Sequence, residues 1–501
     1  MFNTSRSIRA VARFMVIALA IAALGWIAPF AALAEELAPA PTPTEYIYFD
    51  LSAGNVTIKG KTYTGYRFDG NDTAQKITGT LGANQGYYVY QSNGDKIAAN
   101  KQTGYINGEL ILPEHNVVMH GTQTWGDFIT NNTDVGGVID AWKTDAATAG
   151  RKGTANRIEV TGQVGNSLLV IDNVWSTFGQ KDTGRTTAGI SFIPGSITGS
   201  NLTVRYKGDN RLGAIHYTNS KYTTQNGIAV ASNHVILESF TNSNVDTLTV
   251  ADMDKSVNTN YWNAAIGSSD NADNAEGIVI NSGTLFAGTT AADDCTAIGG
   301  GGNGFGIVDI HGGRVTAVVS SSGAAIGGGI GKTSKGGQAV VTITGGEVYA
   351  YNNSCLSGSY SNKGVKYIPA AAIGGGSSAR ETCNECVVNI SGGKVYAQSI
   401  AGTAIGGGSS ADTHGGKAVV NISGNAEVYA KSISGKIGSY DVVAGVAIGG
   451  GTGGAAGNGG NVTLNISGNP AIRTGSIGGG STISTSSSNT IGNAVVNITG
   501  G

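Results

Sequence analysis

The chain has 501 residues, of which 81 are glycine and only 13% are charged. This length can bury a large core, and the glycine content is more than twice the usual share. The 31 Lys and Arg residues nearly balance the 33 Asp and Glu residues. The sequence therefore has no basic footprint of the kind that nucleic-acid-binding proteins carry, and we expect no nucleic-acid partner.

Residues 1–34 are predicted to be a secretory signal peptide. Three arginines in MFNTSRSIRAVAR precede the apolar run MVIALAIAALGWI, and Ala32-Leu33-Ala34 fits a signal-peptidase site before Glu35. An uncleaved membrane anchor is the alternative, because the apolar run is long. The cleavage site favours removal, so we expect a secreted or cell-surface protein that meets the membrane only through this segment before cleavage.

Between the signal segment and the repeats the sequence predicts a linker and a cap. Residues 35–44 contain three prolines and form a short extended linker. Residues 45–155 are expected to be an N-terminal β-rich cap module with one short helix, from about Asp134 to Ala149. The terminal units of a repeat protein must be atypical because they seal the core, so we prefer a cap to a separate catalytic domain.

From residue 156 to 501 the sequence repeats a pattern of strands with a basic period of about 30 residues. The central isoleucines of these strands are 30, 33, 47, 32, 44 and 32 residues apart, and the longer intervals mark insertions. They are Ile280, Ile310, Ile343, Ile390, Ile422, Ile466 and Ile498. A second element, most often Ala-Ile-Gly-Gly-Gly, recurs between them.

Each repeat alternates apolar and polar residues with the period of a strand. In VVNISGGKVYA (387–397), Val388, Ile390, Val395 and Ala397 can face one way, while Asn389, Ser391 and Tyr396 face the other. Units stacked about 4.8 Å apart would join their Ile and Val residues into internal ladders. The pattern predicts an all-β fold, a parallel β-helix (β-solenoid), in which the glycines form corners and a third wall.

Two other functions of the glycine-rich segments fit less well. GGGIGKTS (327–334) would need glycine at position 326 to be a phosphate loop, and Ile326 stands there with no amphipathic helix following. GGGGNGFGIVDI (299–310) has Gly306 where a calcium-binding nonapeptide repeat would carry Asp. We therefore expect no nucleotide ligand.

The segment EYIYFDLSAGNVTIKGKTYTGY, together with the AIGGG, VNISGG and VYA units, resembles a family of exported bacterial cell-surface proteins. The likeness covers nearly all of residues 45–501. It implies a right-handed parallel β-helix and a carbohydrate-binding or adhesin-like role. Such proteins usually continue into a cell-wall anchor, whereas this sequence stops at VVNITGG, partway through a repeat. We therefore expect the repeats to be truncated at the C-terminus.

Cysteines and carboxylates supply the remaining candidate sites. Cys295, Cys355, Cys383 and Cys386 are disulfide candidates in an exported chain, with three complete pairings possible. We prefer a bridge from Cys355 to Cys383 or Cys386. The one cofactor that the sequence suggests is calcium, at Asp270, Asp273 and Glu276, although an acidic solvated turn fits that cluster better.

The predicted function is non-enzymatic binding of a polysaccharide or another cell-surface ligand. Tyr349, Tyr396 and Tyr429 would form an outward row near Asn389 and Asn421, which could hold sugar rings. Such rows also stabilise solenoids without any ligand. A polysaccharide lyase or glycoside hydrolase is one alternative, but carboxylates such as Asp209, beside Arg211, cannot be paired from sequence. A structural stalk that presents a missing C-terminal domain is another.

Overall fold

The computed structural model describes residues 42–69, 73–92, 104–106, 109–111, 153–176, 188–195, 199–217, 222–225, 228–231, 233–252, 264–268, 276–289, 296–302, 304–319, 322–331, 337–352, 370–378, 385–410, 412–437, 440–442, 444–454, 456–482 and 489–500. All of them belong to one compact unit, Ala38–Gly501. The predicted signal peptide and the helix expected over 134–149 lie outside these ranges. Within them every regular element is a strand, and no helix could cross a membrane.

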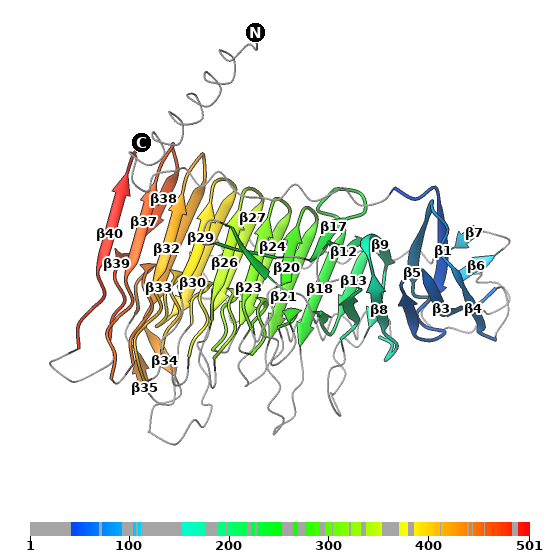
Figure 1. Cartoon of the computed structure of the whole chain (residues 1–501), viewed down its shortest axis with the longest axis horizontal. Coiled ribbons are helices and arrows are strands. Elements are labelled where there is room, and N and C mark those ends of the chain that lie inside the picture. Colours follow the sequence, from blue (N-terminus) through cyan, green and yellow to red (C-terminus); the bar gives the residue numbers. More distant parts are fainter. Residues whose placement is uncertain are drawn as a thin grey trace, which may run out of the picture. The chain divides into compact units, whose positions relative to one another are not determined.

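Three large sheets contain most of the strands. Sheet I has 12 strands, in the order β1 (Glu45–Asp50), β5 (Gln85–Tyr90), β9 (Gly165–Asp172), β12 (Ser200–Lys207), β17 (His234–Ser239), β20 (Glu276–Ile280), β23 (Gly306–Ile310), β26 (Ala339–Ile343), β29 (Cys386–Ile390), β32 (Ala418–Ile422), β37 (Val462–Ile466) and β40 (Ala494–Ile498). Figure 1 shows the later strands of this sheet side by side.

Sheet II has nine strands, in the order β10 (Trp175–Ser176), β13 (Asp209–Leu212), β18 (Thr247–Asp252), β21 (Thr284–Thr289), β24 (Arg314–Val319), β27 (Glu347–Asn352), β30 (Lys394–Ile400), β33 (Glu427–Ile433) and β38 (Ala471–Thr474). All of its strand pairings, like those of sheet I, are parallel.

Sheet III has 13 strands, in the order β39 (Ile477–Gly478), β36 (Ile448–Gly449), β31 (Ile405–Gly406), β28 (Ile373–Gly374), β25 (Ile326–Gly327), β22 (Ile298–Gly299), β19 (Ile266–Ser268), β14 (Ile215–Tyr217), β11 (Ile190–Pro194), β8 (Ile158–Gln163), β2 (Val56–Lys59), β3 (Thr62–Arg67) and β4 (Gln75–Thr80). Its short Ile-Gly strands come from the Ala-Ile-Gly-Gly-Gly segments.

The chain visits the three sheets in turn. For example, β26, β27 and β28 lie in sheets I, II and III, and β29, β30 and β31 follow in the same order. Each strand then pairs in parallel with the strand one rung later. This arrangement confirms the prediction of an all-β fold with long parallel sheets, as a β-solenoid requires.

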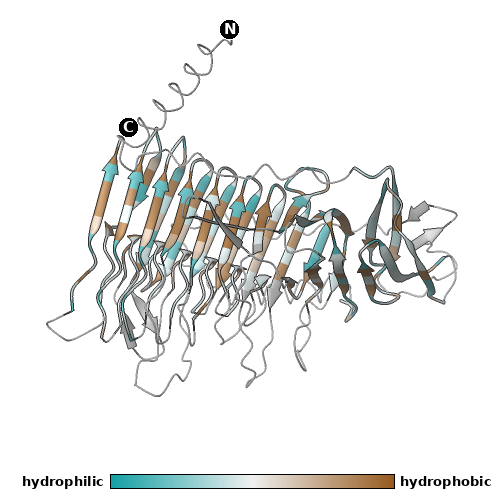
Figure 2. Ribbon diagram, in the orientation of Figure 1, coloured by the Kyte–Doolittle hydropathy of each residue, from teal (hydrophilic) through white to brown (hydrophobic). Residues whose placement is uncertain are grey.

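The core is built from ladders of apolar side chains, one residue per rung. Ile310, Ile343, Ile390 and Ile422 are paired in register on successive strands of sheet I and are at most 1% exposed. Val388, Val395 and Ala397 are also fully buried, as the alternation predicts. The strands in Figure 2 accordingly carry long brown segments. In the last rung these columns open to solvent, and Ile498 of β40 is 66% exposed.

In five consecutive strands of sheet III, β19 to β31, the glycine after the isoleucine has a backbone conformation that side chains rarely adopt. At Gly267, Gly299, Gly327, Gly374 and Gly406 the angle φ lies between +130° and +148°. A Cβ at Gly374 would lie 2.1 Å from the carbonyl oxygen of Gly406 in the next rung, and the other four positions are equally tight. The close stacking of the rungs therefore requires glycine at these positions.

The N-terminal strands join the same sheets as the repeats. Strands β1 and β5 extend sheet I in parallel, and β2 pairs in parallel with β8. Strands β2, β3 and β4 then form an antiparallel meander at the end of sheet III. Three separate hairpins complete the described strands: β6 (Gly104–Ile106) with β7 (Glu109–Ile111), β15 (Tyr222–Gln225) with β16 (Ile228–Ala231), and β34 (Gly435–Ile437) with β35 (Tyr440–Val442).

Candidate binding surfaces

The expected tyrosine row is present on sheet II, but two of its rings are buried. Tyr349, Tyr396 and Tyr429 are register partners on β27, β30 and β33. The rings of Tyr349 and Tyr396 stack with centroids 4.7 Å apart and planes inclined by 5°. Both residues are only 2% exposed, whereas Tyr429 is half-buried. In this structure the first two rings cover each other and leave almost no face for a sugar.

The hydroxyl group of Tyr349 is also engaged within the sheet. Arg314 donates to it over 3.4 Å, and it donates to Glu347 over 3.5 Å. Burial raises the pKa of Tyr349 and of Tyr396 above the ordinary value, so both are neutral at physiological pH. Beside this row, Arg314, Glu347, Lys394 and Glu427 alternate in charge on successive rungs, with two ion pairs of 3.9 and 3.8 Å.

The expected asparagine line is a hydrogen-bonded ladder. Asn421 donates to the Asn389 amide oxygen, Asn465 to that of Asn421, and Asn497 to that of Asn465, each over 2.8 Å. The amide of Asn421 thus uses its oxygen and one N–H group inside the protein. This geometry supports a stabilising role for the ladder, independent of any ligand.

Replacing Asn421 with alanine is expected to lower the free energy of unfolding by about 1–2 kcal/mol, because two ladder hydrogen bonds are lost. Urea denaturation of the variant and of Asn469→Ala would test this. Asn469 is exposed and lies outside the ladder, so its replacement should change the free energy of unfolding by no more than about 0.5 kcal/mol. Equal losses in both variants would contradict a structural ladder.

The metal and disulfide candidates fall largely outside the described residues. Asp270 and Asp273 lie there, and for Glu276 the backbone alone is described. Among the described side chains no group of three His, Cys, Asp or Glu residues could hold a metal. The calcium site remains a prediction.

Of the four cysteines, Cys386 is described and the other three are not. Its thiol is free, fully buried at the start of β29, and donates to the carbonyl oxygen of Gly406 over 2.9 Å. Burial raises the pKa of this thiol to about 12, so it is an inert core group rather than a nucleophile. With the Cys386 thiol free, the expected bridge from Cys355 to Cys386 is not formed in this structure, and a bridge from Cys355 to Cys383 remains a prediction.

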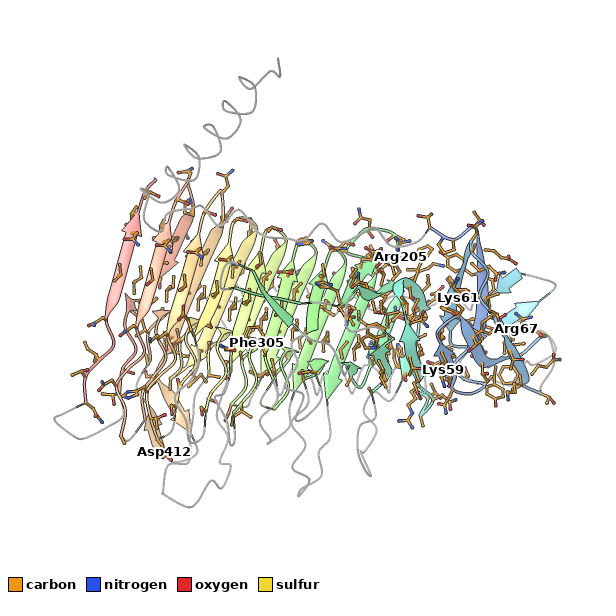
Figure 3. The ribbon with its side chains drawn as sticks, viewed as in Figure 1. Lys59, Lys61, Arg67, Arg205, Phe305 and Asp412 are labelled. Carbon is orange, nitrogen blue, oxygen red and sulfur yellow. The ribbon has the colours of Figure 1, made fainter. Side chains whose placement is uncertain are left out.

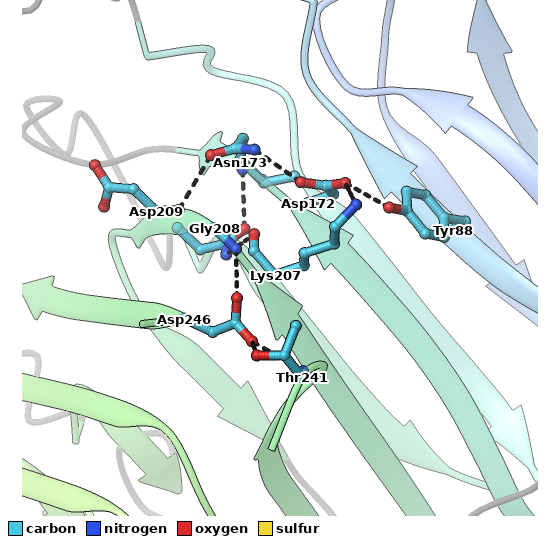
Figure 4. Close-up of polar contacts among 10 residues, drawn as sticks. Tyr88, Asp172, Asn173, Lys207, Gly208, Asp209, Thr241 and Asp246 are labelled. Carbon is cyan, nitrogen blue, oxygen red and sulfur yellow. Dashed lines mark hydrogen bonds and ion pairs between the residues drawn. The ribbon is translucent and has the colours of Figure 1, made fainter. Parts of the chain in front are cut away.

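A network of polar side chains that the sequence did not reveal lies at the corner where the chain passes from sheet I to sheet II (Figure 4). The carboxylate of Asp172 accepts hydrogen bonds from the Tyr88 hydroxyl and from Asn173, and Lys207 pairs with it at 3.2 Å. Its side chain is 1% exposed. Burial, followed by the neighbouring Asp172 charge, raises the pKa of Tyr88, which therefore remains a hydrogen-bond donor.

Asp246 organises the longer corner between β17 and β18, two rungs after the corner that holds Asp172. It accepts hydrogen bonds from the Ser239 hydroxyl, from the backbone and hydroxyl of Thr241, and from the backbone of Gly208, over 2.6–3.0 Å. Burial alone would raise its pKa, but these donors more than offset that effect and its pKa lies below the ordinary value. The carboxylate is therefore ionised and serves to fix the turn.

The Asp209–Arg211 pair is a buried ion pair rather than an open catalytic site. The two side chains are 3.0 Å apart and only 7% and 1% exposed. The guanidinium of Arg211 lies 4.2 Å from the ring centroid of Trp175, whose indole N–H donates to the carbonyl oxygen of Asp209. The Arg211 charge, its stacking on Trp175 and the hydrogen bond from the indole thus all find partners within the neighbouring strands β10 and β13.

A second aromatic group, which was not among the sites expected from sequence, lies on the outer face of sheet I. Tyr46 and Tyr48 of β1 and Tyr88 of β5 form a cluster with ring centroids 5.1–6.3 Å apart. Tyr46 and Tyr48 are half-buried, and Tyr88 is 5% exposed. The alternation in EYIYFD places both β1 tyrosines on one face, and this is the signal that could have revealed them.

No family model, no curated protein and no solved structure matches this chain.

Proposed function

We propose that this chain is an exported bacterial surface protein that binds glycans or other cell-surface ligands, in the manner of an adhesin, without catalysing a reaction. We propose further that its solenoid is a right-handed β-helix with rungs of about 30 residues. The observation that best supports binding is the register of the outer faces. On sheet I and sheet II, side chains of similar type recur on successive rungs.

Such columns suit an extended polymer. Adjacent parallel strands are about 4.8 Å apart, so a column repeats its hydrogen-bonding groups at a spacing close to the length of one sugar unit. Of the groups expected from sequence, Tyr349 and Tyr396 are buried, so the candidates that such a polymer could reach are Tyr429, Asn389 and Asn421, which are half-buried. A polysaccharide with many weak contacts along such a face would be held without a deep pocket.

The test is a pull-down of the full chain with insoluble polysaccharides, together with a glycan array, with and without calcium. Retention without release of soluble sugars is the expected result. Release of oligosaccharides would contradict the proposal and favour a β-helix lyase or hydrolase. Binding that requires calcium would direct attention to Asp270, Asp273 and Glu276.

A structural stalk is the second candidate, because a specific observation favours it. The rings of Tyr349 and Tyr396 stack on each other, and the amides of Asn389 and Asn421 bond to each other. Both expected binding rows thus have internal partners that stabilise the solenoid. If no glycan is retained in the pull-down, the stalk becomes the better explanation of these rows.

A further inference from the structure

We propose that the outer face of sheet I, from β1 to β23, binds a neutral glycan chain, with Tyr46 and Tyr48 as the ring platform and Arg205, Glu238, Asn281 and His311 as the hydrogen-bonding row. This inference rests on the proposed function, to which it adds a place and a ligand class. The place differs from the sheet II tyrosine row that the sequence suggested.

The rings of Tyr46 and Tyr48 are held in position by the Tyr88 ring, against which both pack. Tyr48 packs against Tyr88 with ring centroids 5.1 Å apart, and Tyr46 meets Tyr88 edge-on at 5.4 Å. The hydroxyl of Tyr88 is anchored on Asp172. Position 86 is glycine, and a Cβ there would lie 3.1 Å from the Tyr46 ring. The two outer rings are therefore preorganised while part of their surface stays accessible.

The polar part of the site continues from these rings along the sheet. Register places Tyr48, Tyr88, Val170, Arg205 and Glu238 in one column across β1, β5, β9, β12 and β17. Arg205, labelled in Figure 3, pairs with Glu238 at 2.5 Å. Asn281 donates to Glu238 over 3.2 Å, and His311 lies 3.1 Å from the Asn281 amide oxygen. This chain of side chains offers donors and acceptors in alternation.

The charges of the surface indicate which glycan it would take. Two cations, Arg205 and Lys207, are each paired with a carboxylate, Glu238 and Asp172. The local charge is therefore balanced, and an acidic polymer would gain little from the cations and would meet Glu238 as a like charge. Sugar hydroxyls both donate and accept, so they can bond to either member of such a pair.

The accessibility of this surface distinguishes it from the sheet II row. The Lys207 side chain is 43% exposed and lies 5.8 Å from the ring centroid of Phe240, which is itself 38% exposed. Tyr46 and Tyr48 are half-buried, whereas Tyr349 and Tyr396 are 2% exposed. Aromatic rings with an accessible face can pack on the apolar faces of pyranose rings, and buried rings cannot.

The test is affinity electrophoresis of the full chain through gels that contain a soluble β-glucan, a galactomannan or, as the acidic probe, polygalacturonate. The double variant Tyr46→Leu, Tyr48→Leu keeps apolar bulk on Tyr88 but removes the ring faces. It is expected to bind the retained neutral polymer about tenfold more weakly. The matched control is Tyr66→Leu, which changes a half-buried tyrosine of β3 in sheet III, outside the proposed surface. It should bind within about twofold of the unmodified protein.

Circular dichroism and thermal melting would establish that the variants are folded, and Tyr46→Leu alone serves if the double variant is not. Unchanged binding by the Tyr46 and Tyr48 variants would overturn the site but leave the proposed function standing, and loss of binding in Tyr429→Ala would then direct attention to sheet II. Preference for polygalacturonate would overturn the ligand class. If the unmodified protein binds none of the polymers, both the inference and the proposed function fail.

Discussion

Replacing Gly374 with alanine is expected to lower the free energy of unfolding by about 3 kcal/mol or more. The residue has φ of +130°, where an L side chain is strained by about 1–3 kcal/mol. The new methyl group would lie 2.1 Å from the carbonyl oxygen of Gly406, a backbone atom that cannot rotate away. Adjacent rungs would have to separate, which would break the pairing of β28 with β31.

Urea denaturation followed by circular dichroism measures this effect. Gly475→Ala is the matched control, because the same Cβ would meet no atom within 4 Å and φ at Gly475 lies outside the left-handed region. Its free energy of unfolding should change by no more than about 0.5 kcal/mol. Similar midpoints for the two variants would show that the glycine triplets are not required for stacking.

The parts of this fold that sequence predicts are those that depend on neighbouring residues along the chain. Val388, Ile390 and Ala397 alternate with polar residues, and a buried strand face follows from that alternation alone. The repeated motif also predicts the register across insertions of different length, so the partnership of Tyr349 with Tyr396 could be foreseen. Long parallel sheets of this kind can accordingly be predicted once the repeated motif is recognised.

Exposure of the outer faces could not be foreseen in the same way. The repeat pattern predicts that Tyr349, Tyr396 and Tyr429 lie in one row, but it does not predict how much of each ring is accessible to solvent. The direction of the amide ladder from Asn421 to Asn389 also depends on the side-chain conformations of both rungs. These properties arise from packing between segments, which the alternation within one strand does not encode.

The cluster on sheet I was hidden for a topological reason. Tyr48 meets Tyr88 across 40 residues, Tyr88 meets Val170 across 82, and Arg205 follows 35 residues later. These early rungs have no constant period, so sequence spacing does not reveal which strands are neighbours. The surface that joins Tyr48 to Arg205 therefore became visible only once the pairing of β1, β5, β9 and β12 was known.

Replacing Asp209 with alanine is expected to destabilise the protein by about 3–5 kcal/mol, because it removes a carboxylate that pairs with a buried cation. Arg211 is 1% exposed, and arginine does not lose its charge in proteins. The matched control is Glu427→Ala, which removes a carboxylate from Lys394 at 3.8 Å in a pair that is about half exposed. Exposed pairs of this kind contribute about 0–1 kcal/mol, so that variant should be nearly neutral in urea denaturation.

The double variant Asp209→Ala, Arg211→Met identifies the cause of the loss. If the loss comes from the missing charge partner of Arg211, removing the Arg211 charge should recover part of the stability. The contact of the guanidinium with Trp175 at 4.2 Å is also lost in this variant, so the recovery is not complete. Methionine retains the length and apolar bulk needed beside the indole ring. A double variant no more stable than Asp209→Ala would mean that the hydrogen bonds of Asp209, such as that from Thr247, matter more than charge pairing. In that case the early rungs of sheet II would be stabilised by polar contacts between strands rather than by an ion pair.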